Sequence, residues 1–131
     1  MPRSKKLRIA SQALIGMVGV VLVLAGTLKL INVGADDMLE GLRNARLIQH
    51  TNLISITAII CGVLLLVPLS RPFGVLMSTA YWGGAIVAHL TYDDSAIMPA
   101  FFLTVLWLGV FIGAYIPIRT KPKPSEGSLD V

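Results

Sequence analysis

The chain has 131 residues, of which 55% are hydrophobic and 14% are charged, and its formal net charge is +4. A soluble domain of this length carries about one-quarter charged residues, so the composition excludes an ordinary soluble domain. The charges are confined to a few places and leave long uncharged runs. A bilayer crossing needs about 20 mostly apolar residues, and four such runs fill nearly the whole chain. The sequence therefore predicts an all-α integral membrane four-helix bundle with four transmembrane helices.

Two further classes of function are disfavoured by composition. The basic residues lie at the chain ends and beside the apolar runs, not on a basic face interleaved with aromatic residues, which argues against nucleic-acid binding. The single cysteine, Cys61, lies inside an apolar run. Without a C-x-x-C pair, thiol–disulfide chemistry is excluded.

The N-terminal part of the chain predicts a basic cytoplasmic leader over residues 1–8 and a first span over 9–31. A secretory signal also starts with basic residues, but its apolar core is about 7–15 residues long and ends in a small-residue cleavage site. This run is longer, so we expect a retained span. Residues 32–46 are polar and form either a short interfacial helix or a solvated loop.

The remaining spans follow in close succession. A turn from Pro68 to Pro72 separates the second from the third, because proline cannot continue the preceding helix. The tail, 119–131, is rich in proline and serine, and we expect it to be disordered. The membrane domain is thus 9–118, and its other three spans are 47–69, 73–90 and 98–118.

The distribution of positive charge predicts the orientation. With four spans, eight of the 11 lysines and arginines lie on the side of the two termini and three on the other side. Because lysine and arginine are enriched in cytoplasmic loops, we expect both termini in the cytoplasm.

Small residues recur every four positions on three of the spans, as at close contacts between membrane helices. We expect them either to pack the bundle on itself or, on the fourth span, to form a homodimer seam. The three sets are Ala58 and Gly62; Ala80, Gly84 and Ala88; and Gly109 and Gly113.

Ionisable side chains near the non-cytoplasmic ends of the spans form the candidate site. Lys29, His50 and His89 all fall about 10–14 Å above the bilayer midplane, from the rise per residue. Such groups are costly unless they pair, reach water or serve a function. Lys29 can also reach the interface alone, and His50 can be merely interfacial. The full candidate set is Lys29, His50, Asn52, His89, Tyr92 and Asp93.

Three kinds of ligand suit histidines at this level to different degrees. Haem accepts two imidazoles, but both histidines lie near one surface, which disfavours it. A quinone fits a histidine and an acid beside an amphipathic pocket. A catalytic metal needs three or more ligands, and no H-x-x-x-H or similar motif is present.

Three segments resemble the DoxX-like family of small four-span bacterial membrane proteins: residues 25–30 (AGTLKL), 68–74 and 83–90 (GGAIVAHL). The likeness covers about residues 9–118. It implies a four-helix membrane bundle in the inner (plasma) membrane, and the matching positions are Lys29, Arg71, Gly84 and His89. Family members commonly carry a glutamate in the second span. Here residues 56–59 (ITAI) contain no carboxylate, which weakens a lysine–glutamate pair.

The resemblance implies function only loosely, since some members belong to quinone-linked oxidoreductases and others assist the maturation of periplasmic enzymes. Two functions stay open. We favour a non-catalytic subunit or assembly factor of a membrane redox or biogenesis complex, with other membrane proteins or a second copy as partners in the lipid bilayer. The alternative is a quinone-binding subunit of an oxidoreductase.

Overall fold

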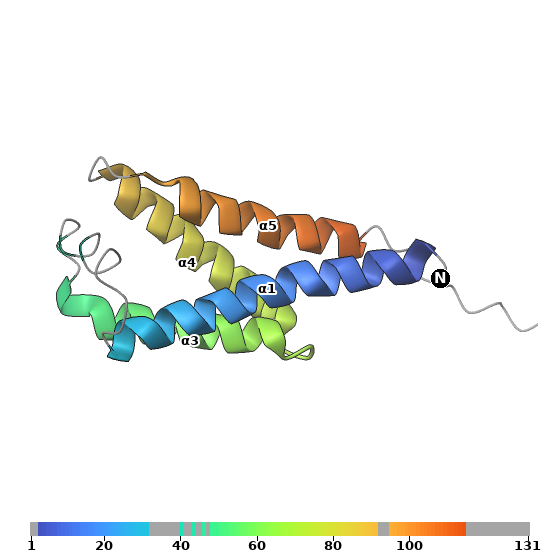
Figure 1. The fold of residues 1–131 in the computed structure, drawn as a ribbon, viewed down its shortest axis with the longest axis horizontal. Helices are drawn as coiled ribbons and strands as arrows, with labels where there is room; N and C mark the ends of the chain where they lie inside the picture. Colours follow the sequence, from blue (N-terminus) through green and yellow to red (C-terminus); the bar gives the residue numbers. More distant parts are fainter. Residues whose placement is uncertain are drawn as a thin grey trace, which may run out of the picture.

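The computed structural model describes residues 3–31, 40, 43, 46, 48–91 and 95–114. Every element assigned in this part of the chain is helical (Figure 1). The fold class is therefore all-α, as predicted, and four α-helices of 16 residues or more lie within the described residues. The elements are α1 (Arg3–Ile31), the short 3-10 helix η1 (Ile48–His50), α3 (Thr51–Leu66), α4 (Arg71–Thr91) and α5 (Ile97–Ala114).

The basic leader is the start of α1 rather than a separate segment. The structure describes this helix from Arg3 to Ile31, so it covers the expected span 9–31 and begins six residues before it. Residues 3–8 contain neither glycine nor proline, so nothing in them ends the helix. Helices α4 and α5 begin within two residues of their predicted starts. The predicted interfacial helix lies almost entirely outside the described residues, as do the tail and residues 115–118.

Helix α3 is shorter than the predicted span 47–69. It has 16 residues, or about 24 Å at 1.5 Å per residue. His50 precedes it without a side-chain cap, and its last turn closes with a hydrogen bond from the Val67 amide to the Val63 carbonyl, just before Pro68. Three helices, α1, α4 and α5, are long and apolar enough to cross a membrane. A crossing by α3 stays a prediction.

The four helices form a ring in which each packs mainly against two neighbours. Helix α1 contacts α3 and α5, α4 also contacts α3 and α5, and α1 and α4 face each other across the ring. The start of α1, the α3–α4 turn and the end of α5 lie at one end, which we call the Ser11 end (right in Figure 1). The opposite end, where α1 and α4 finish, is the Lys29 end.

Two of the three small-residue sets pack α1 against its neighbours. A Cβ added at Gly62 of α3 would lie 2.6 Å from the Gly19 carbonyl oxygen of α1. A Cβ at Gly109 of α5 would lie 2.9 Å from Ile15, and the Ser11 hydroxyl donates a 2.7 Å hydrogen bond to the Gly109 carbonyl. The G-x-x-x-G pair of the fourth span is thus used within the chain, because α1 already occupies the place where a second copy would dock.

The third set does not pack inside the bundle, contrary to expectation. Ala80 and Gly84 are exposed, and no atom lies within 4 Å of a Cβ added at Gly84. Around them α4 exposes large apolar side chains, including Phe73 at 69% and Leu76 at 68%. This face of α4 therefore points away from the other three helices.

Candidate polar site

The four predicted site residues that the structure describes separate into two pairs. Lys29 and His89 are half-buried on α1 and α4, whereas His50 and Asn52 are exposed at the start of α3. Tyr92 and Asp93 lie outside the described residues. Lys29 and His89 therefore remain as interior members of the set, and the structure leaves His50 and Asn52 at its surface.

Lys29 points into the bundle. Its ammonium donates a 3.5 Å hydrogen bond to the Tyr81 hydroxyl of α4. Because α1 and α4 are on opposite sides of the ring, this contact crosses the interior. Side chains in an α-helix lean toward its N-terminus, and for Lys29 that direction leads deeper into the bundle. The structure thus favours an interior lysine over one that reaches the interface alone.

The interior face of α4 is unusually polar. Ser78, Trp82, Ala85 and His89 recur at i, i+4, i+7 and i+11, the spacing of one helix face. Ser78 is completely buried, Trp82 is 9% exposed and His89 is half-buried. His89 therefore lies on the side of α4 that faces the other helices, about two turns beyond Trp82.

Three buried polar atoms of α3 and α4 have no hydrogen-bond partner among the described residues: Ser55 Oγ, Ser78 Oγ and Trp82 Nε1. The Cys61 thiol of α3 lies beside Ser78, but a thiol is a weak partner and Ser78 makes no well-formed bond to it. An unpaired buried polar group costs about 1–3 kcal/mol. The interior thus holds unused hydrogen-bonding capacity.

Five threonine hydroxyl groups in the helices contrast with these three atoms, because each has a hydrogen-bond partner. Each of five threonines donates to the carbonyl four residues earlier in its own helix, a local bond that suits apolar surroundings. The five are Thr27, Thr57, Thr79, Thr91 and Thr104.

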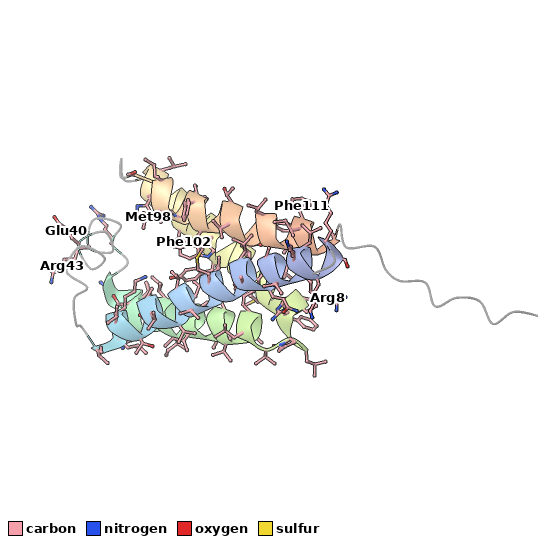
Figure 2. The ribbon with its side chains drawn as sticks, turned by 45° about the vertical axis from the view of Figure 1, so that its right-hand side comes forward. Arg8, Glu40, Arg43, Met98, Phe102 and Phe111 are labelled. Carbon is pink, nitrogen blue, oxygen red and sulfur yellow. The ribbon has the colours of Figure 1, made fainter. Side chains whose placement is uncertain are left out.

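Aromatic rings form one wall of the site. The Trp82 ring stacks on Phe102 of α5 at a centroid distance of 5.2 Å and meets Tyr81 edge-on at 5.4 Å. Figure 2 shows Phe102 on the side of α5 that faces the other helices. Stacked and edge-to-face pairs hold their rings in defined orientations, so the Trp82 indole has a fixed position.

The core toward the Ser11 end is mostly apolar, and the buried Ser11 hydroxyl is paired with the Gly109 carbonyl. Its fully buried side chains are Val18, Leu22, Leu65 and Leu106. The unpartnered part of the polar interior is therefore toward the Lys29 end. We call it the polar half of the core, which comprises Lys29, Ser55, Ser78, Tyr81, Trp82 and His89.

Sequence reasoning placed Lys29 and His89 here but missed Ser55, Ser78 and Trp82 as members. The four-and-seven spacing of Ser78, Trp82, Ala85 and His89 is a signal that was available. The chemistry offered is hydrogen-bond donation beside one positive charge. Among the described residues, no three His, Cys, Asp or Glu side chains come together as a metal site would require.

Comparison with known proteins adds no further assignment. No protein-family model, curated protein or solved structure matches the chain. The likeness to the DoxX-like family stays a prediction from the sequence, and the functional argument depends on the arrangement of the chain's own residues.

Proposed function

We propose that the chain is a DoxX-like four-span protein of the bacterial inner membrane that serves as a non-catalytic subunit or assembly factor of a membrane redox or biogenesis complex. The observation that carries this proposal is the outward face of α4. Its small residues, Ala80 and Gly84, are exposed. In contrast, α1 packs directly against the small residues of α3 and α5.

Small residues matter on such a face because membrane helices associate by close van der Waals contact. An exposed glycine between larger apolar side chains lets a second helix approach the backbone closely. On α4, Gly84 lies between Leu76 and Met77 on one side along the helix and Val87 on the other, all of them exposed. A transmembrane helix of a partner protein is the occupant that this shape suits.

Substitution of Gly84 tests the proposal. Protein extracted from its native membrane in mild detergent should carry partner proteins that native mass spectrometry detects. Gly84→Leu should remove them, because its side chain fills the contact, and Gly84→Ala should weaken them less. Gly16→Leu is the matched control, since no atom lies within 4 Å of a Cβ at Gly16 either. Partner-free wild-type protein, or partners kept by Gly84→Leu, would contradict the proposal.

The proposed topology has both termini in the cytoplasm. It is supported by the exposed basic residues on the first turns of α1, namely Arg3, Lys5, Lys6 and Arg8, since such residues favour the cytoplasmic side. A reporter that is active only in the cytoplasm should be active when it is fused after Val131. A reporter active in the periplasm would refute the orientation.

A further inference from the structure

The polar half of the core contains more donors than acceptors. The Trp82 indole N–H is donor-only, and the Lys29 ammonium has three donors and no acceptor. Among the described residues, the ammonium has one partner, the Tyr81 hydroxyl, at the long distance of 3.5 Å. The group that complements such a site is an acceptor with several oxygens.

The positive charge of the site further restricts the class of ligand. Glu40 is the one carboxylate among the described residues, and it lies exposed in the segment between α1 and η1, away from the helices (Figure 2). A lysine inside a membrane protein is costly unless an opposite charge or water meets it. An anionic oxygen group relieves this cost, whereas a neutral carbonyl compound supplies acceptors without the compensating charge.

The buried, unpartnered atoms lie close along the helices to the lysine contact. On α4, Ser78 is three residues before Tyr81, and Trp82 directly follows Tyr81. Ser55 of α3 meets α1 at Gly26, since its carbonyl oxygen would lie 2.7 Å from a Cβ there. Gly26 is three residues from Lys29. All three unpartnered groups are thus within about one helical turn of the Lys29–Tyr81 contact.

Helix α1 packs most closely against α5 near the Ser11 end. The close contacts of α1 with α5 are at Ser11 and Ile15, and the axes of α1 and α5 diverge toward the Lys29 end (Figure 1). Toward the Ser11 end the interior is closed by the apolar core. A ligand that binds among membrane helices comes from the bilayer, so we expect it to have an apolar body.

We propose that the polar half of the core binds an amphiphile with an oxyanion head, a carboxylate or a phosphate. The head accepts hydrogen bonds from Lys29, Trp82 and Ser78, and the apolar tail runs along Phe102 toward lipid. The proposal is independent of the partner surface on α4, because the two lie on opposite faces of that helix.

Quenching of Trp82 fluorescence by brominated lipids tests the proposal on the full chain in detergent. The second tryptophan, Trp107, is 37% exposed on α5, and Trp107→Phe leaves Trp82 as the reporter. A dibrominated fatty acid should quench Trp82 with saturation. Its methyl ester, which has the same tail without the charge, should require about tenfold more ligand, the loss of a charge-assisted hydrogen bond. A dibrominated phosphatidylglycerol distinguishes a phosphate source from a carboxylate source.

Substitutions within the site identify the group that holds the head. Lys29→Met should raise the half-saturating concentration about tenfold, while Lys29→Arg should largely preserve binding. Lys6→Met, which removes an exposed lysine from the same helix, is the matched control and should change nothing. If Lys29→Met does not fold, Ser78→Ala supplies the test and should weaken the quenching several-fold.

Three results would overturn the proposal: equal quenching by acid and ester, saturable quenching unchanged in Lys29→Met and Ser78→Ala, or saturable binding of a neutral quinone with none of either anion. Gly84→Leu should leave the quenching unchanged while it removes protein partners. Failure of the partner proposal is therefore distinguishable from failure of the ligand proposal.

Discussion

Glycine has two opposite roles in this bundle, and the difference is set by what each position faces. At Gly62 a side chain would collide with the Gly19 carbonyl and with Val23 across the α1–α3 contact. At Gly16 the same side chain would meet no atom within 4 Å. The two residues look alike in the sequence, since both lie in apolar helical runs, and only the packing separates them.

Gly62→Ala should destabilise the protein by about 1–3 kcal/mol, the usual cost of overpacking a filled contact. The added methyl group meets backbone at 2.6 Å on α1, and backbone moves less easily than a side chain end. Equilibrium unfolding in mixed detergent micelles, followed by circular dichroism, measures the change.

Gly16→Ala provides the comparison. It should stabilise α1 by up to about 1 kcal/mol, because alanine has the higher helix propensity and nothing obstructs it. Equal effects of the two substitutions would show that the α1–α3 contact is looser than the structure has it.

At the scale of the element, α4 shows what the sequence could and could not predict. Its length and apolar character predicted a helix close to the observed bounds, Arg71–Thr91. The direction of its faces was not predictable from small residues alone, since Ala80 and Gly84 have the same spacing as Ala58 and Gly62. The reason is physical: a small residue permits close approach but does not say which helix approaches.

Cysteine labelling along α4 should follow the helical period. In a Cys61→Ala background, Leu76→Cys and Ala80→Cys should react with a maleimide in detergent, because both positions are exposed. Ser78→Cys should react at least tenfold more slowly, because Ser78 is completely buried. Uniform reaction at the three positions would mean that α4 does not pack by the face described.

The candidate site divides in the same way. The sequence predicted Lys29 and His89 as members of a costly ionisable group from their places in apolar runs. It did not predict that the Lys29 ammonium donates a hydrogen bond to the hydroxyl of Tyr81, eight residues before His89. That contact depends on α1 and α4 facing each other across the ring. The order of helices around a bundle is set by their packing, and the number and length of the predicted spans do not determine it.

For the whole molecule, the helices are staggered. Gly19 of α1 meets the last turn of α3 at Leu65 and Leu66, whereas Ser11 meets Gly109 of α5. From the eight residues between Ser11 and Gly19, α1 continues about 12 Å beyond the end of α3. Figure 1 shows that α1 and α5 both extend past the α3–α4 turn. Counting apolar residues gave four similar spans, because it counted the turn around Pro68 as part of the second.

The α3–α4 turn is built to lie below the surface formed by the longer helices. The Ser70 hydroxyl donates to the Leu64 carbonyl, and the Arg71 Nε–H donates to the Leu65 carbonyl. The last carbonyls of α3 are thereby paired within the chain. Irregular backbone is tolerated at membrane depth only when its polar groups are satisfied in this way.

The stagger makes the folded state sensitive to bilayer thickness. Helix α3 spans about 24 Å and the hydrocarbon core about 30 Å. In the proposed four-span arrangement the bilayer would therefore thin beside the α3–α4 turn. Each ångström of mismatch costs a fraction of a kcal/mol. In nanodiscs of monounsaturated phosphatidylcholines, thermal stability should therefore be higher with 14- or 16-carbon chains than with 22-carbon chains.

The same series of nanodiscs distinguishes the effect of the α3–α4 turn on stability from the effect of the other parts of the bundle. Arg71→Leu removes the bond to the Leu65 carbonyl and a charge that favours the interface, so it should lower stability while it flattens the dependence on chain length. Lys6→Leu, on the exposed start of α1, should keep that dependence. Greatest stability in the 22-carbon bilayer would mean that the short helix does not lie across the membrane beside α1, and the four-span arrangement would then be wrong.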